Sequence, residues 1–174
     1  MILEALRITA AWLQDGTNGV NALIDGLTQD GGDSDPPDVT VLEESTSPVA
    51  ARRHLDVNTS VPVLMVVLAR AVGSEGYVTT NYLSGSVTVG ILYATRNADS
   101  DEGTEDALYT LRAVQQSINL LMKPANVASR TRNNVVLTHT SRMEILPVEN
   151  DREDAVITHG LFVTYEARDT EPYG

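Results

Sequence analysis

The chain contains two residue patterns that could hold a metal ion, and the first is acidic. Asn97, Asp99 and Asp101 occur at alternate positions, as do the first ligands of a calcium-binding loop. The pattern then fails, because the glycine comes one position late, at Gly103, and the twelfth position is Leu108 instead of glutamate. We therefore interpret this segment as a solvated acidic loop and assign no metal to it.

The second pattern is a pair of histidines, His139 and His159. Both lie in segments that we expect to form the two strands of a hairpin with its turn near Asp151. In that register the numbers of opposed residues have an even sum, so both side chains project from one face as diagonal neighbours. Two histidines could bind zinc, but no third ligand is evident nearby. We prefer a pair of half-buried, hydrogen-bonded histidines, and we predict no metal and no cofactor.

The sequence lacks the arrangements that support covalent catalysis. It has no cysteine, no Gly-x-Ser-x-Gly elbow and no glycine-rich phosphate loop. No pair of carboxylates marks a rigid element either. We therefore predict no catalytic residue and expect that the protein is not an enzyme.

The charge of the chain excludes some partners. Its 174 residues include 12 basic and 24 acidic side chains, for a net charge of −12. Binding to nucleic acid or to an anionic membrane needs clustered lysine and arginine. No apolar run approaches the roughly 20 residues that span a bilayer. An acidic surface commonly serves solubility alone, and the alternative is a wall past which DNA moves without adhering.

Residues 86–122 give the clearest signals of secondary structure. The alternation of Val87, Val89, Ile91 and Tyr93 predicts a strand. A polar loop follows, and Thr104 is suited to begin a helix as its N-cap. Apolar residues then recur at steps of three and four, which predicts a helix over about 104–122; they are Leu108, Leu111, Val114, Ile118, Leu121 and Met122.

The same reasoning predicts helices near the start of the chain and strands elsewhere. We expect a helix from residue 2 to about 14 with Trp12 in the core, and a second helix after a turn at Gly16 and Gly19. We expect strands over 39–42, 61–72, 135–146 and 155–168, the last two forming an antiparallel hairpin. Residues 61–72 are apolar on both faces, so we expect both faces to be covered. These elements predict one α+β domain over 1–174, with a mixed, mainly antiparallel β-sheet and an N-terminal helix and the long helix packed on it.

Three long polar segments connect these elements, and long loops often bind a partner. Residues 28–38 and 97–103 are acidic, whereas 123–134 is basic and reads as the least structured part of the chain. An acidic loop on one copy could contact the basic loop on the next copy. Such a contact joins unlike surfaces and closes into a ring if the rotation allows. The residues that this hypothesis places at a subunit interface are Asp99, Asp101, Glu102, Arg130 and Arg132. The alternative is three unrelated flexible loops.

The order and shape of the elements resemble the tail terminator (tail completion) proteins of long-tailed bacteriophages. The resemblance covers most of the chain and lies in its elements, not in one motif. It includes the N-terminal amphipathic helix Ile2 to Leu13, the strands Val61 to Val72 and Val87 to Tyr93, the charged loop that leads into the helical segment Ala107 to Val114, and the terminal strand Leu161 to Arg168.

The resemblance implies a structural subunit of the virion with no catalytic residue. Such subunits form a hexameric ring that caps the tail tube, ends its polymerisation and provides the surface that joins the tail to the head. The implied partners are copies of the chain, the tail tube protein and a head-tail connector or stopper protein, while DNA passes through the lumen without specific binding. The implied location is the head-proximal end of the tail, after assembly in the host cytoplasm. The alternatives are a connector or stopper protein of the neck and, more remotely, a small enzyme or ligand-binding domain.

Overall fold

The computed structural model describes residues 2–24, 37–42, 62–73, 84–95, 101–148 and 157–170. In chain order its elements are α1 (Ile2–Leu13), α2 (Val20–Ile24), β1 (Thr40–Leu42), β2 (Val63–Gly73), β3 (Ser84–Ala94), α4 (Asp101–Leu121), the 3-10 helix η1 (Pro124–Asn126), β4 (Thr131–Arg132), β5 (Val135–Pro147) and β6 (Ile157–Asp169). The predicted α+β fold class is confirmed.

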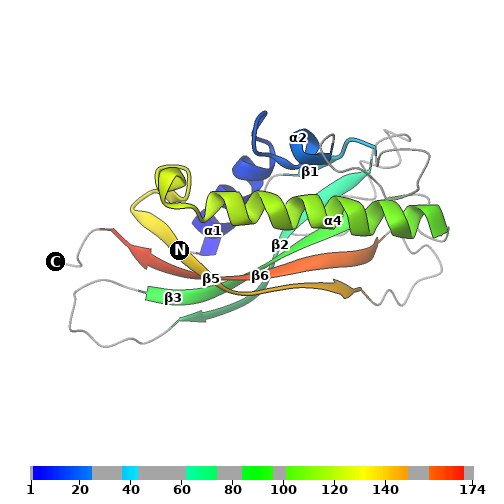
Figure 1. Cartoon of the computed structure of the whole chain (residues 1–174). Helices are drawn as coiled ribbons and strands as arrows, with labels where there is room; N and C mark the ends of the chain where they lie inside the picture. The colour runs from blue at the N-terminus through cyan, green and yellow to red at the C-terminus, as the bar shows by residue number, and fades with distance from the viewer. Residues whose placement is uncertain are drawn as a thin grey trace.

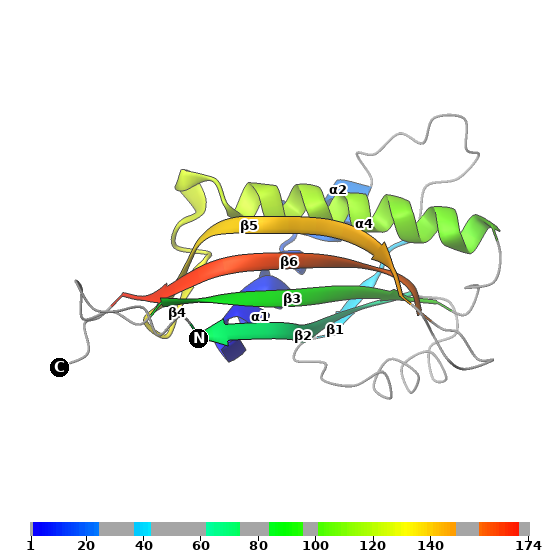
Figure 2. The same ribbon diagram turned by 90° about the horizontal axis from the view of Figure 1, so that it is seen from below.

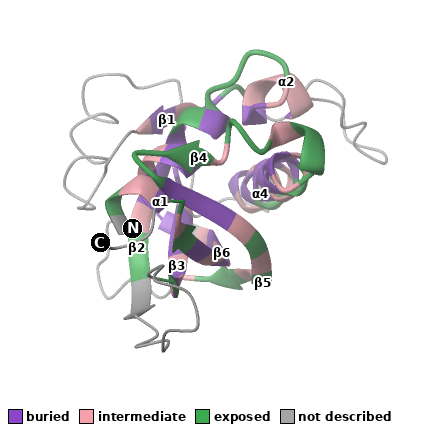
Figure 3. Ribbon diagram, turned by 90° about the vertical axis from the view of Figure 1, so that its left-hand side faces the viewer, coloured by how far each residue is buried: buried purple, intermediate pink, exposed green. Residues whose placement is uncertain are grey.

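The strands form one six-stranded sheet in the order β1-β2-β3-β6-β5-β4. β1 pairs with β2 in parallel, and every other neighbouring pair is antiparallel, as predicted. The four long strands lie along one side of α4 (Figure 1). Figure 2 views the molecule from below, with the sheet in front of α1, α2 and α4. Figure 3 shows that the sheet curls so that β5 bends toward α4.

The helix α4 is anchored by its apolar stripe. Leu111, Val114, Ile118 and Leu121 are fully buried, as their spacing predicts, whereas Leu108 remains 41% exposed. The helix begins at Asp101, three residues earlier than expected, so Thr104 lies inside it and is not its N-cap. Acidic residues are favoured in a first helical turn because the helix dipole is positive there, which explains why residues assigned to the loop join the helix.

Two apolar clusters flank the sheet. The larger one joins α1 and α4 to one face and includes Trp12, whose Nε1 donates to the Ser117 carbonyl at 2.7 Å. The smaller one lies on the other face and includes Val63 and Met65 of β2. The first half of β2 is therefore covered on both faces, as predicted, but Leu68 is 44% exposed. Coverage of both faces along the whole strand was an incorrect expectation.

Two glycines on the sheet make room for an aromatic ring. A Cβ atom at Gly90 would lie 3.2 Å from Phe162 Cε1, and one at Gly160 would lie 2.6 Å from Leu92 Cδ2 and 3.3 Å from Phe162 Cε2. Gly90 of β3 and Phe162 of β6 are cross-strand partners. The small residue at position 90 thus accommodates packing within the chain.

The basic segment after α4 is ordered, which corrects the expectation of a loop over 123–134. It forms η1, a turn and the short strand β4. Asn133 and Asn134 have φ angles of 46° and 63° and connect β4 to β5 as a two-residue hairpin. Asparagine tolerates this left-handed conformation, and two consecutive residues with positive φ are typical of a tight hairpin turn.

Within the described residues, no helix is both long enough and apolar enough to cross a membrane.

The stripe of α4 predicts the outcome of one substitution. Leu111→Asp places an unpaired carboxylate in the core, so we expect it to lower the free energy of unfolding by more than about 4 kcal/mol and to leave the chain unfolded. Leu108→Asp, on the exposed side of the same helix, should cost less than about 1 kcal/mol. Circular dichroism with urea titration measures both variants, and a folded Leu111→Asp protein with the same unfolding midpoint as Leu108→Asp would contradict this account of the core.

Candidate functional site

The two ends of α4 carry opposite charges. Its first six residues include Asp101, Glu102, Glu105 and Asp106, and the segment that follows its last residue contains Lys123, Arg130 and Arg132. A helix of 21 residues rises about 30 Å along its axis. The two charged ends therefore lie at opposite ends of the subunit (Figure 1) and cannot contact each other within one copy.

The acidic end differs from its prediction in conformation. Asp101 and Glu102 form the first turn of α4 and not part of a loop. Glu105 is exposed one turn further along the helix. Asp99 lies outside the described residues, as do most residues of the first acidic segment, 28–38. Because Asp101 is helical, it does not have the loop conformation that the calcium pattern would require.

Arg130, at the basic end, makes hydrogen bonds within its own chain. Its half-buried guanidinium donates from Nη1 to the carbonyl oxygens of Met122 at 3.0 Å and Thr138 at 3.3 Å. The side chain thereby connects the chain just after α4 to β5. Its Nε is buried and has no hydrogen-bond partner among the described residues. Arg130 thus has a structural role that sequence reasoning missed, and its role between subunits stays a prediction.

Other bonds hold the basic end in place. The Asn126 amide donates to the Leu120 carbonyl at 2.7 Å, inside the last turn of α4. The Asn133 amide donates to Glu4 Oε1 at 3.1 Å and lowers the pKa of that carboxyl group. The basic end is therefore a fixed part of the subunit surface.

In the segment that follows α4, the exposed cations are Lys123 and Arg132. Val127 lies between them in the sequence and is 49% exposed, more than any other large apolar residue of the described chain. A segment that exposes two cations and an apolar side chain suits contact with an acidic surface. Lys123 was not among the predicted interface residues, although its position after the last helical turn marks it as belonging to this end.

The two histidines are far apart, so the expectation that they are diagonal neighbours was wrong. His139 pairs with Glu166, whereas His159 pairs with Pro147, eight residues further along β5, or roughly 26 Å along a strand. Irregularities between Leu137 and His139 and between Thr140 and Arg142 shift the hairpin register. Among the described residues, no cluster of three or more histidine or carboxylate side chains could hold a metal ion.

A groove of about 390 Å³ lies between the end of α1, α2 and β1. Three of the polar side chains that line the groove make hydrogen bonds to the backbone around it. The Asn21 side chain donates to the Val39 carbonyl and accepts from the Val39 amide, and Gln14 donates to the Val41 carbonyl. Asp15 accepts from the backbone amides of residues 17 and 18, which lowers its pKa. Sequence patterns did not reveal these bonds because their partners lie up to 27 residues away.

Comparison with known proteins leaves the function to be argued from geometry. No protein-family model matches the chain, and no curated protein matches it either.

The bonds of Arg130 lead to a stability prediction. Arg130→Met keeps most of the aliphatic side chain but removes the Nη1 group that donates to the two carbonyl oxygens. We therefore expect the free energy of unfolding to fall by about 1–3 kcal/mol. Arg132→Met, at the neighbouring exposed arginine, should change it by no more than about 0.5 kcal/mol. Urea denaturation followed by tryptophan fluorescence gives both values, and an Arg130→Met protein as stable as the Arg132→Met protein would remove the proposed structural role.

Proposed function

We propose that the protein is a structural subunit that assembles with copies of itself into a ring at the head-proximal end of a bacteriophage tail. In this proposal the ring is a hexamer that caps the tail tube, ends its polymerisation and offers the surface that joins tail to head. The observation that carries the proposal is the placement of acidic and basic groups at opposite ends of one rigid helix.

Charges placed in this way favour contact between different copies. The acidic end of α4 in one subunit is complementary to the basic end, with Lys123 and Arg132, of the next subunit. Each subunit would use one end to contact the copy before it and the other end to contact the copy after it. A contact of this type generates a closed ring when the rotation between subunits divides a full turn evenly.

The surface chemistry supports the same assignment. A net charge of −12 repels the phosphates of DNA, so a ring of such subunits could let DNA pass through its lumen without binding it. The proposal includes no catalytic residue, metal or cofactor. Its partners are the tail tube protein and a head-tail connector or stopper protein, and its location is the virion after assembly in the host cytoplasm.

The contact between the two ends is tested by charge reversal. Lys123→Glu with Arg132→Glu should abolish ring formation while leaving the subunit folded, because both side chains are exposed. Adding Glu102→Lys and Glu105→Lys to the same chain should restore rings by exchanging the signs of the two ends. Arg112→Glu, in the exposed middle of α4, is the matched control and should leave assembly unchanged.

Sedimentation velocity and negative-stain imaging record the outcome of this test. Rings that form equally well in the Lys123→Glu/Arg132→Glu protein would show that these two ends do not make the contact. Failure of the fourfold variant to regain rings would show that the two ends do not contact each other.

The role in the tail is tested separately with purified tail tube protein from the same phage. We expect the ring to bind the end of a growing tube and to stop its elongation, which electron microscopy measures as a shorter tube length. A ring that binds the portal-side connector but leaves tube growth unchanged would instead identify a connector or stopper protein.

A further inference from the structure

Among the described residues, the outer edge of β5 has no neighbouring strand over most of its length. β4 pairs with β5 only at Val135 and Val136. The next two residues bond to Arg130, since Leu137 donates its amide to the Arg130 carbonyl and the Thr138 carbonyl accepts from the Arg130 side chain. From His139 to Pro147 no described residue bonds to this edge. Figures 2 and 3 show β5 as the outermost long strand on this side of the sheet.

The opposite edge of the sheet is closed by side chains. Asn21 exchanges two hydrogen bonds with the Val39 backbone next to β1, at 2.9 and 3.0 Å, and Gln14 donates to the Val41 carbonyl at 3.0 Å. An unpaired edge is a template for another strand, and proteins commonly block such edges. In the part of the chain that the structure describes, side chains bond to the outer side of β1, and nothing bonds to the outer side of β5 between His139 and Pro147.

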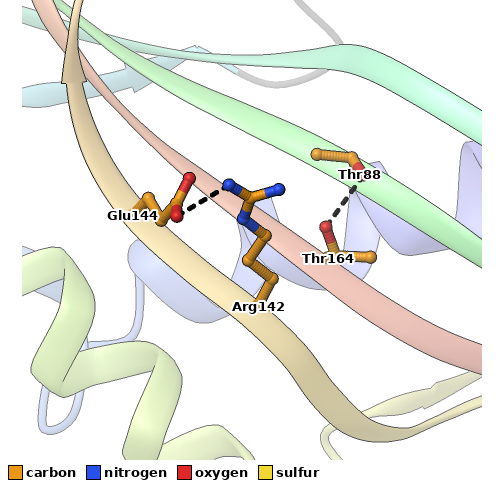
Figure 4. A network of polar contacts seen from close by, with 4 residues as sticks. All are labelled: Thr88, Arg142, Glu144 and Thr164. Carbon is orange, nitrogen blue, oxygen red and sulfur yellow. Dashed lines mark hydrogen bonds and ion pairs between the residues drawn. The ribbon is translucent and has the colours of Figure 1, made fainter.

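The open edge carries one cation and one anion that are two residues apart. Arg142 Nη2 lies 2.8 Å from Glu144 Oε1, and this bond raises the pKa of Arg142. Both side chains lie on the same face of the sheet (Figure 4), where Arg142 is exposed and Glu144 is partly exposed. Met143 lies between them in the sequence and is half-buried against the core.

We propose that the β5 edge binds the β5 edge of a second copy, antiparallel, about a two-fold axis at Met143. A two-fold axis perpendicular to the sheet keeps the same face of both copies on the same side. In an antiparallel pair, such an axis runs between one residue and the same residue of the second copy, which lie directly opposite each other. An axis at Met143 places Arg142 opposite Glu144 of the second copy and Glu144 opposite its Arg142. The four charges then alternate in sign, and cross-strand pairs of opposite charge stabilise a sheet.

The neighbouring registers are disfavoured by the same charges. A two-fold axis at Arg142 would place the two copies of this arginine opposite each other. An axis at Glu144 would do the same with the two glutamates. Like charges directly opposite each other destabilise a strand pair. The irregularity between Thr140 and Arg142 limits regular pairing to the centre of the edge, so the charged residues and Met143 determine the register.

This contact is independent of the head-to-tail contact of the proposed function. A two-fold contact joins like surfaces, whereas the contact between the two ends of α4 joins unlike surfaces. The β5 contact therefore links two free subunits or subunits of two different rings, and neither contact requires the other.

The absence of cysteine from the chain allows a direct test by disulfide formation. In the proposed register the two copies of residue 143 have Cα atoms about 4.5–5.5 Å apart, within the range that a disulfide bridges. Met143→Cys should thus form a covalent dimer under mild oxidation. Leu146→Cys is the control. Leu146 is 43% exposed, but in this register the two copies of residue 146 lie roughly 20 Å apart along the strands.

Charge reversal in the Met143→Cys protein tests the register. Adding Arg142→Glu should slow dimer formation about tenfold, because two opposite-charge pairs become like-charge pairs. Adding Glu144→Arg as well should restore the original rate. Arg168→Glu, at an exposed arginine on the neighbouring strand, should leave the rate unchanged. Cross-linking of Leu146→Cys as fast as Met143→Cys, or no loss of rate with Arg142→Glu, would overturn the proposal.

Hydrogen exchange of the unmodified protein gives a second test that does not depend on the cysteine variants folding. Amides of residues 142–144 should gain protection as the protein concentration rises. Protection that does not change with concentration would overturn the proposal. Protection that arises only when tail tube protein is added would overturn it too, because the edge would then receive a strand from another protein.

Discussion

The burial of one stripe of α4 against the curled sheet is the interaction on which the rest of the structure depends. Leu111 and Ile118 are fully buried there, and β6 supplies Tyr165 to the same cluster. Each such side chain stabilises the fold by about 1.5–3 kcal/mol when it leaves water. Because the stripe runs along the whole helix, α4 is held as a rigid rod whose two ends have fixed positions. The packing of the stripe therefore holds the opposite charges of the two ends at fixed places on the surface of the subunit.

Polar side chains bond to the backbone at the two outer sides of the described sheet. Asn21 and Gln14 bond to the backbone beside and within β1, and Arg130 bonds to the start of β5. Each is a side chain at or near a helix end that reaches the backbone of an outer strand. Over residues 139–147, which include Arg142 and Glu144, the outer side of β5 pairs with no other described strand. We propose that association uses the β5 edge of the sheet as well as the two ends of α4.

The sequence predicted those parts of the fold that depend on periodicity. The stripe of α4, the alternation in β3 and the β5-β6 hairpin all follow from spacing that local packing enforces. The start of α4 was placed too late because the acidic residues were assigned to a loop, although the helix dipole favours them in a first turn. The asparagine pair at 133–134 is a turn signal that would have revealed the β4-β5 hairpin.

The candidate site could be predicted only in part. The charge of each segment is visible in the sequence, but the distance between the two charged ends requires the length of α4 and its rigid packing. The structural bonds of Arg130 were not predictable, since their acceptors are backbone carbonyls that the fold of the segment brings near. The separation of His139 from His159 follows from the hairpin register. In the register of Val135 with Asp169, His159 would already oppose Ile145, six residues from His139, and the strand irregularities add two residues.

The central claim, that the protein functions by assembling with itself, is tested most directly by native mass spectrometry of the unmodified protein combined with electron microscopy. The account predicts closed rings with a uniform number of 18.8 kDa subunits, six in each ring. Single subunits or isolated two-subunit particles at every concentration, with no ring in the images, would contradict it.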